Sequence, residues 1–85
     1  MAYETKELSA AQMNIFAAVG REWVFERRDA WNVSELGRHL ECLGMSPHIG
    51  EDVKSMVKGG WFTELAPGIV QITSLCKSEA ARFFP

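Results

Sequence analysis

Apolar residues recur at helical spacing near the start of the chain, directly after a helix-start signal. Ser9 and Gln12 have the spacing of a capping box, and Leu8 stands where a hydrophobic staple begins. These residues predict a first helix over residues 10–27, preceded by a loose lead-in at 1–7. Its main apolar stripe consists of Met13, Phe16, Ala17, Gly20, Trp23 and Val24.

Two further apolar residues, Ile15 and Val19, fall on a second side of this helix. One core-facing side does not bury both sets, so another element has to cover the second side. The candidates are the last helix of the same chain and a second copy of the chain. We expect the cover to come from within the chain, and a homodimer through the first and last helices is the alternative.

A second helix is predicted over residues 33–43. Asn32 is a suitable N-cap, and Glu35 at the third helical position completes a capping-box pattern. Gly37 lowers helix propensity by about 1 kcal/mol relative to Ala, which indicates close approach of a neighbouring helix. Gly44 is expected to end the helix in the left-handed conformation. The apolar side comprises Val33, Leu36, Gly37, Leu40 and Leu43.

A third helix is predicted over residues 47–59, with Ser46 as its cap and Pro47 at its first position. Gly59 and Gly60 are expected to end it. The apolar residues recur at positions i, i+4, i+7 and i+8, which places one side of this helix in the core. They are Ile49, Val53, Met56 and Val57.

Two strands, at 61–65 and 69–73, follow this helix and form a hairpin rich in aromatic and β-branched residues. Pro67 and Gly68 occupy the two central positions of the turn, a pattern typical of a type II turn.

A final helix is expected to start at Thr73 or Ser74, and a turn or short edge strand at 28–31. The final helix aligns Cys76, Ala80, Phe83 and Phe84. Together these elements predict an α+β fold for residues 1–85 as a single winged-helix domain. It has a three-helix core, a two- or three-stranded antiparallel β-wing and a short C-terminal helix.

Three stretches resemble the winged helix-turn-helix superfamily, and within it the small bacterial MarR-type DNA-binding modules. The run VSELGRHL at 33–40 is similar to the second helix of the family, and the run at 46–61 is similar to its recognition helix and the start of its wing. The run ITSLCKSEAARF at 72–83 resembles the closing strand-to-helix junction. The resemblance spans 12–84, with two departures: Cys76 stands where the family has Gly, and the short wing has no Lys or Arg.

The composition is that of a globular protein, but the net charge is unusual for a DNA-binding protein. Of the 85 residues, 47% are hydrophobic and 24% charged, and the net charge is −2. A basic excess is therefore absent, which lowers the expectation of phosphate binding. Two cysteines without CxxC spacing favour a reducing cytoplasmic location, and no stretch approaches the roughly 18 apolar residues of a membrane span.

Five residues are the candidate DNA-binding set. His48, Lys54, Ser55 and Lys58 lie opposite the apolar side of the third predicted helix, and Arg38 lies on the outer side of the second. In helix-turn-helix proteins this third helix enters the major groove. Lys54 and Lys58, one turn apart, suit two phosphates or a guanine edge.

The plainer interpretation is a solvated helix side on which Glu51 pairs with Lys54 or Ser55. Glu51 and Asp52 complement the helix dipole at its start, yet they repel phosphates at the place where DNA would approach.

No catalytic or metal site is predicted. The soft potential ligands are His39, Cys42, His48 and Cys76, and they do not form the four-donor pattern of zinc. Cys42 is expected to be a surface thiol and Cys76 a core residue. Because the sequence also contains no recognised nucleophile motif, GxxxxGK or GxGxxG, we expect neither an enzyme nor a cofactor.

Two functions fit these observations. The first is a small DNA-binding transcriptional regulator, and the second is a winged-helix protein-interaction module, either an assembly subunit or an inhibitor of a nucleic-acid-handling machine. The aromatic surplus suits the second, with Phe25, Phe62 and Phe84 expected to be exposed. A positive patch around Lys54 and its neighbours favours DNA, whereas a contiguous apolar patch with acidic surroundings favours a protein partner.

Overall fold

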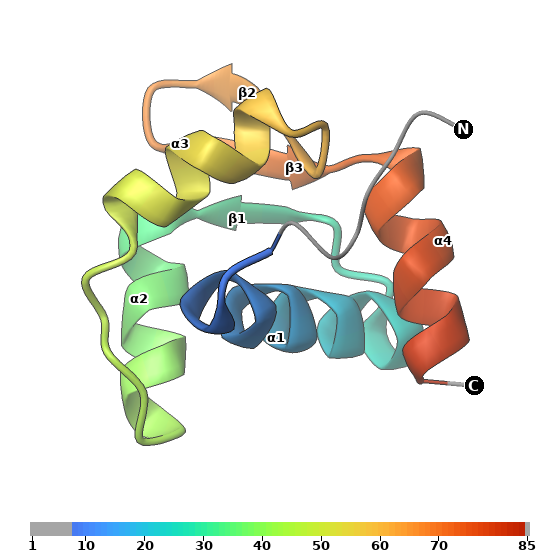
Figure 1. Ribbon diagram of the computed structural model, residues 1–85, viewed down its shortest axis with the longest axis horizontal. Coiled ribbons are helices and arrows are strands. Elements are labelled where there is room, and N and C mark those ends of the chain that lie inside the picture. The colour runs from blue at the N-terminus through green and yellow to red at the C-terminus, as the bar shows by residue number, and fades with distance from the viewer. Residues whose placement is uncertain (1–7, 85) are drawn as a thin grey trace.

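The computed structural model describes residues 8–84, and in this part the chain forms four helices and three strands (Figure 1). The predicted α+β class is confirmed. The loose lead-in predicted at 1–7 lies outside the described residues. The elements are α1 (Ala10–Glu26), β1 (Ala30–Asn32), α2 (Val33–Cys42), α3 (Gly50–Lys58), β2 (Phe62–Ala66), β3 (Ile69–Ile72) and α4 (Ser74–Phe83).

Helix α1 begins as the sequence predicts, because Ser9 and Gln12 form the reciprocal capping box. It ends at Glu26, one residue earlier than predicted, and the C-cap residue Arg27 has a left-handed φ of 58°. The ranking of its two apolar sides was wrong: Ile15 and Val19 are fully buried, whereas Met13 of the expected main stripe is 37% exposed. Ile15 and Val19 belong to the same buried cluster as Leu36 of α2 and Val70 of β3, so their side of α1 faces the core.

Helix α4 covers the other apolar side of α1 within the same chain. A Cβ on Gly20 would lie 3.0 Å from the Ala80 Cβ, so the two helices approach closely there. The Phe16 and Phe83 rings meet edge to face with centroids 5.5 Å apart. Both apolar sides of α1 are therefore covered within the chain, as expected, but α4 covers the side of Phe16 and Gly20 and not the side of Ile15 and Val19 to which it was assigned.

Helix α2 starts at its predicted cap, where the Asn32 side chain accepts hydrogen bonds from the Ser34 and Glu35 N–H groups. The Glu35 side chain was predicted to complete a capping box. Its carboxylate instead accepts a hydrogen bond from the Arg28 guanidinium at 2.8 Å. The helix ends one residue earlier than predicted. Leu43 is therefore a C-cap residue that is 54% exposed rather than part of the core.

The predicted start of the third helix was wrong. Helix α3 begins at Gly50, three residues after Pro47, with Ile49 as an N-cap that makes no side-chain hydrogen bond. Ser46 instead accepts a hydrogen bond from the His48 N–H within the connection. This connection packs on α2, where a Cβ on Gly37 would lie 2.8 Å from the Pro47 carbonyl oxygen. The predicted close approach at Gly37 is real, but the neighbour is this connection and not a helix.

The strands form an antiparallel sheet in the order β1-β3-β2, with β1 as the edge strand predicted around residues 28–31. Pro67 and Gly68 make the two-residue turn between β2 and β3, and the φ of 81° at Gly68 fits the predicted type II turn. Thr73 then caps α4 by accepting from the Cys76 N–H, and its hydroxyl donates to the Gly60 carbonyl at 2.6 Å.

Of the three aromatic residues that were expected to be exposed, one is exposed in the structure. Phe25 is 60% exposed, as predicted, but Phe62 is 2% exposed because it faces the helices beside Ile72, its cross-strand partner. Phe84 is half-buried over Gly20. No helix within residues 8–84 is long and apolar enough to cross a membrane.

Candidate functional site

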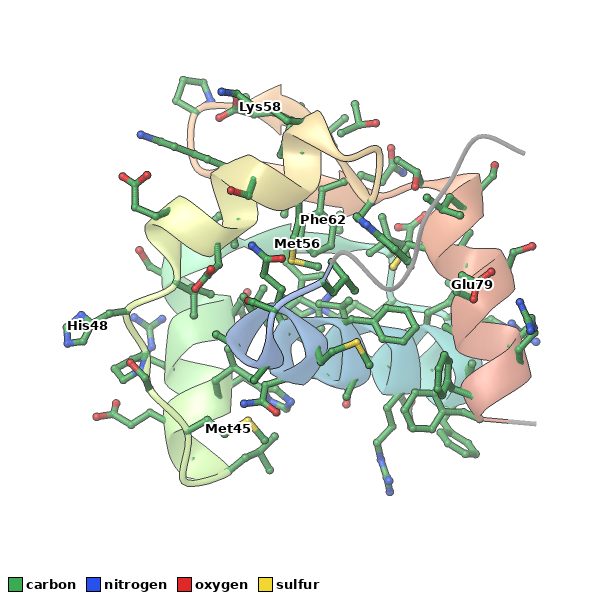
Figure 2. The ribbon with its side chains drawn as sticks, in the orientation of Figure 1. Met45, His48, Met56, Lys58, Phe62 and Glu79 are labelled. Carbon is green, nitrogen blue, oxygen red and sulfur yellow. The ribbon has the colours of Figure 1, made fainter. Side chains whose placement is uncertain are left out.

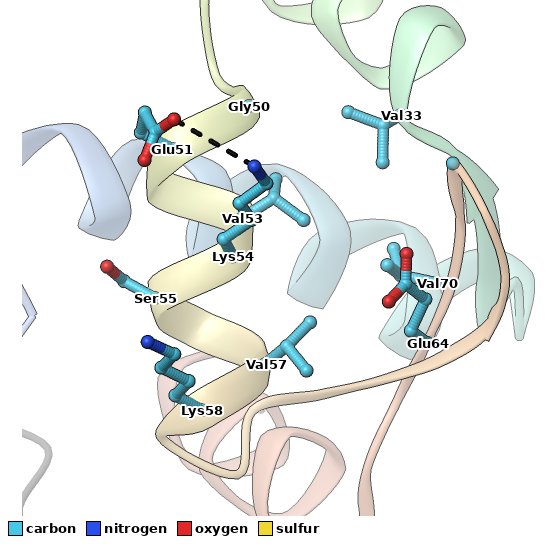
Figure 3. A pocket seen from close by; sticks show the side chains of 11 residues that line it. Val33, Gly50, Glu51, Val53, Lys54, Ser55, Val57, Lys58, Glu64 and Val70 are labelled. Carbon is cyan, nitrogen blue, oxygen red and sulfur yellow. Dashed lines mark ion pairs between the residues drawn. The ribbon is translucent and has the colours of Figure 1, made fainter.

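A groove of about 520 Å³ lies between α3 and the β2–β3 hairpin, and we call it the α3–hairpin groove (Figure 3). Its floor consists of four valines from three elements, α2, α3 and β3. Val53 and Val70 are almost fully buried, whereas Val33 and Val57 are only partly buried. Figure 3 shows Val53 and Val57 pointing from α3 toward the hairpin. The core therefore continues to the surface at this point.

A backbone hydrogen bond holds the hairpin wall of the groove to the start of α2. The Val33 N–H, at the start of α2, donates to the Gly68 carbonyl at the hairpin turn over 2.8 Å. Gly50 and Gly68 both line the groove, and a Cβ at either position would meet nothing within 4 Å.

The borders of the groove carry opposite charges. On the α3 border, the Lys54 ammonium lies 4.0 Å from the Glu51 carboxylate, and both side chains are highly exposed. Such an exposed pair contributes little to stability because water screens it. Lys58 extends the same border, and Glu64 of β2 stands on the hairpin border. In residues 62–72 the hairpin contains no Lys or Arg.

The structure brings three of the five candidate DNA-binding residues together. Lys54, Ser55 and Lys58 follow one another along the exposed side of α3. His48 is exposed but lies in the connection before α3, and Figure 2 shows it far from Lys58. Arg38 is exposed on α2.

Ion pairs engage half of the cations that the structure describes. Carboxylates pair with Arg28, Lys54, Lys77 and Arg82. Arg21 and Arg27 stack on Phe25 and Trp23, at the far end of α1. Among the carboxylates of residues 8–84, none lies within ion-pair distance of Arg38 or Lys58.

The two thiols differ as predicted. Cys42 is exposed, whereas Cys76 is buried, and burial raises the pKa of the Cys76 thiol to about 12. That thiol therefore stays neutral at ordinary pH. Within residues 8–84, no three His, Cys, Asp or Glu side chains are grouped as a metal ion would require.

Sequence reasoning found the α3 border of the groove but missed the groove itself. Val33, Glu64 and Val70 come from three elements, and only the docking of the hairpin beside α3 brings them together. No family model, curated protein or solved structure matches the chain. What this arrangement offers a ligand is apolar contact along the floor and ion pairs along both borders.

Proposed function

We propose that this chain is a winged-helix module that binds a segment of a partner protein in the α3–hairpin groove. The order of two helices and a hairpin, with β1 completing an antiparallel sheet, supports the winged-helix class. The sequence resemblance at 33–40, 46–61 and 72–83 supports it as well.

The observation that carries the proposal is an open apolar floor between borders of opposite charge. Protein interfaces combine an apolar centre with a polar rim, and here Val33 and Val57 form the accessible centre. Glu51 and Glu64 belong to the rim. An apolar patch with acidic neighbours is the pattern that favours a protein partner.

Phosphate binding has weaker support at this surface. Duplex DNA carries one negative charge per about 1.7 Å of its axis, and affinity comes largely from cations that neutralise these charges. On α3, the cation free of an ion pair with a described carboxylate is Lys58, and it lines the groove together with Glu51 and Glu64. The hairpin adds no cation that could follow a minor groove.

Duplex DNA is nevertheless the second candidate ligand, and transcriptional regulation the corresponding function. The supporting observation is the row of Lys54, Ser55 and Lys58 along the exposed side of α3, which is the element that reads the major groove in helix-turn-helix proteins.

A titration of random duplex DNA at low salt separates the two candidates. We expect no binding at tens of micromolar protein, a range in which sequence-independent contact is measurable. Binding in this range would favour DNA. In that case Lys54→Ala together with Lys58→Ala would lower the salt slope by about 2.

A selection from a phage-displayed library of short random peptides tests the groove directly. Peptides enriched on the wild-type chain are compared on Val57→Glu, which places a carboxylate on the floor. Leu65→Glu is the matched control, because Leu65 is 54% exposed on the hairpin and does not line the groove. We expect affinity to fall at least tenfold on Val57→Glu alone, whereas equal loss on both variants, or on neither, would overturn the proposal.

A further inference from the structure

We propose that strand β2 pairs with β2 of a second copy of this chain, antiparallel and centred on Thr63, so that two three-stranded sheets join into one. The surface concerned is the outer edge of β2. Because this contact uses backbone groups of the edge and not the floor of the α3–hairpin groove, the inference does not rest on the proposed function.

Strand β2 is an outer strand of the sheet, and its outer edge carries unpaired backbone groups. The Thr73 N–H donates to the Trp61 carbonyl at 3.1 Å, which fixes one hydrogen-bonded pair of the ladder between β2 and β3. Such pairs recur at every second residue, so Thr63 also bonds to β3, whereas Phe62 and Glu64 point their N–H and C=O groups outward. No backbone group of residues 8–84 pairs with these outward groups, and Figure 1 shows β2 at the outer margin of the molecule.

This edge has little of the protection that outer strands usually carry. Lysine, proline, a bulge or a covering element commonly prevents an outer strand from pairing with another chain. Residues 62–66 contain no Lys, Arg or Pro, and Thr63, Glu64 and Leu65 are exposed. A register shift between Glu64 and Ala66 interrupts the ladder, so the regular part of the edge is 62–64. An added strand therefore meets a short and defined set of donors and acceptors.

The positions of the outward groups select one register for two antiparallel copies. With Thr63 at the two-fold axis, Phe62 of each copy lies opposite Glu64 of the other, and each such pair exchanges two hydrogen bonds. All outward groups of 62–64 are then paired. An axis at Glu64 would place like carboxylates directly opposite each other, which is destabilising. An axis at Phe62 would place Glu64 opposite Gly60, whose φ of 87° lies outside the strand conformation.

A second copy of the chain is the occupant that suits this edge. The outward groups lie symmetrically about Thr63, so the edge is its own complement, as a two-fold contact requires. The register places two threonines opposite each other, a pair that stabilises antiparallel sheets. Each copy also supplies a strand that folding has already fixed, whereas a disordered segment would lose conformational entropy on pairing.

Disulfide trapping tests the register. Thr63→Cys and Leu65→Cys are each made in a Cys42→Ser background, which removes the exposed thiol and leaves the buried Cys76. Both positions are exposed on β2, so Leu65→Cys is the matched control. In the proposed dimer the two Cα atoms at position 63 lie about 4.5 Å apart, within disulfide range, whereas those at position 65 lie about 13 Å apart. In oxidised glutathione we expect Thr63→Cys to form the covalent dimer about tenfold faster than Leu65→Cys.

Sedimentation equilibrium tests whether the edge makes the contact. Glu64→Pro removes an outward N–H, and an outer strand accepts proline where its N–H is unpaired. Glu64→Ala is the matched control, because it removes the same carboxylate and keeps the N–H. We expect the average mass of the wild type and of Glu64→Ala to rise with concentration from 9.5 kDa toward twice that value, while Glu64→Pro stays monomeric.

Two results would overturn the proposal. The first is a wild-type chain that stays monomeric up to about 1 mM, or a Glu64→Pro chain that associates as the wild type does. The second is a disulfide that forms at position 65 as fast as at position 63, or faster. The trapping experiment contains no proline, so it decides the register even where Glu64→Pro unfolds.

Discussion

The contact between Gly37 and the connection before α3 determines where α3 begins, and Gly37→Ala tests it. A Cβ at this position would lie 2.8 Å from the Pro47 carbonyl oxygen, where an ordinary contact is at least 3.4 Å. The obstructing atom belongs to the backbone, so it does not move by a side-chain rotation. The connection would have to shift away from α2 by about 0.6 Å.

Two effects of known size oppose each other in this variant. Alanine is a better helix former than glycine by about 1 kcal/mol, which stabilises α2. Overpacking of a closely fitted contact costs about 1 to 3 kcal/mol. We expect the second to prevail, with a net loss of about 1 kcal/mol in the free energy of unfolding and a melting temperature lower by about 4 to 8 °C.

Gly50→Ala is the matched control, because a Cβ at Gly50 meets nothing within 4 Å. This variant should be more stable than the wild type by about 0.4 to 1 kcal/mol, since alanine restricts the unfolded chain. Urea unfolding followed by far-ultraviolet circular dichroism measures both variants. A Gly37→Ala protein as stable as the wild type, beside a stabilised Gly50→Ala protein, would refute the packing of the connection on α2.

Further predictions concern the thiols, the first cap and the contact between α1 and α4. In the native state a thiol reagent should modify Cys42 and spare Cys76, and in urea it should modify both. Because burial raises the pKa of the Cys76 thiol from 9.0 to about 12, only the unfolded chain loses this proton between these values, and stability should fall by up to about 1.4 kcal/mol per pH unit there. Cys76→Ala should remove that part of the pH dependence in urea unfolding, and an unchanged dependence would contradict the burial. Ser9→Ala should lower the free energy of unfolding by about 1 kcal/mol through loss of the α1 cap, while no loss would show that the cap is unimportant. Gly20→Ala should destabilise the protein because its Cβ would lie 3.0 Å from that of Ala80, and a rise in melting temperature would disprove the close approach of the two helices.

Short-range signals in the sequence located most of the elements correctly. The Ser9 box, the Asn32 cap, the Pro67–Gly68 turn and the Thr73 cap all act within three residues of the backbone groups they satisfy. Such interactions depend on local sequence alone, so they are readable without tertiary information.

The errors arise where distant parts of the chain meet. Ser46 and Pro47 form a favourable helix start, but the contact with Gly37 holds this stretch in the connection, and α3 begins later. On α1, helical spacing identified both apolar sides, but the side predicted to be the main one is not the more deeply buried. Ile15 and Val19 lie at the centre because α4 occupies the side of Phe16 and Gly20.

The candidate site was predictable only in its charged part. Lys54 and Lys58 follow from helical spacing, as does the exposed pair of Lys54 with Glu51. The valine floor was not predictable, because it depends on the placement of the hairpin beside α3 and on the hydrogen bond from the Val33 N–H to Gly68. The incomplete burial of Val33 and Val57 results from this tertiary arrangement, and the hydrophobic pattern of the sequence does not reveal it.

Amide and methyl NMR shifts of the isotope-labelled chain, recorded while a wild-type-selected peptide is added, test the central claim most directly. If the α3–hairpin groove is the binding site, the largest shifts should fall on the methyl groups of Val33, Val53, Val57 and Val70 and on the amides of the β2–β3 turn. Largest shifts on the outer side of α4 would contradict the proposed site. A response of Lys54, Ser55 and Lys58 to random duplex DNA, with no response of the valine methyl groups to peptide, would contradict the proposed function.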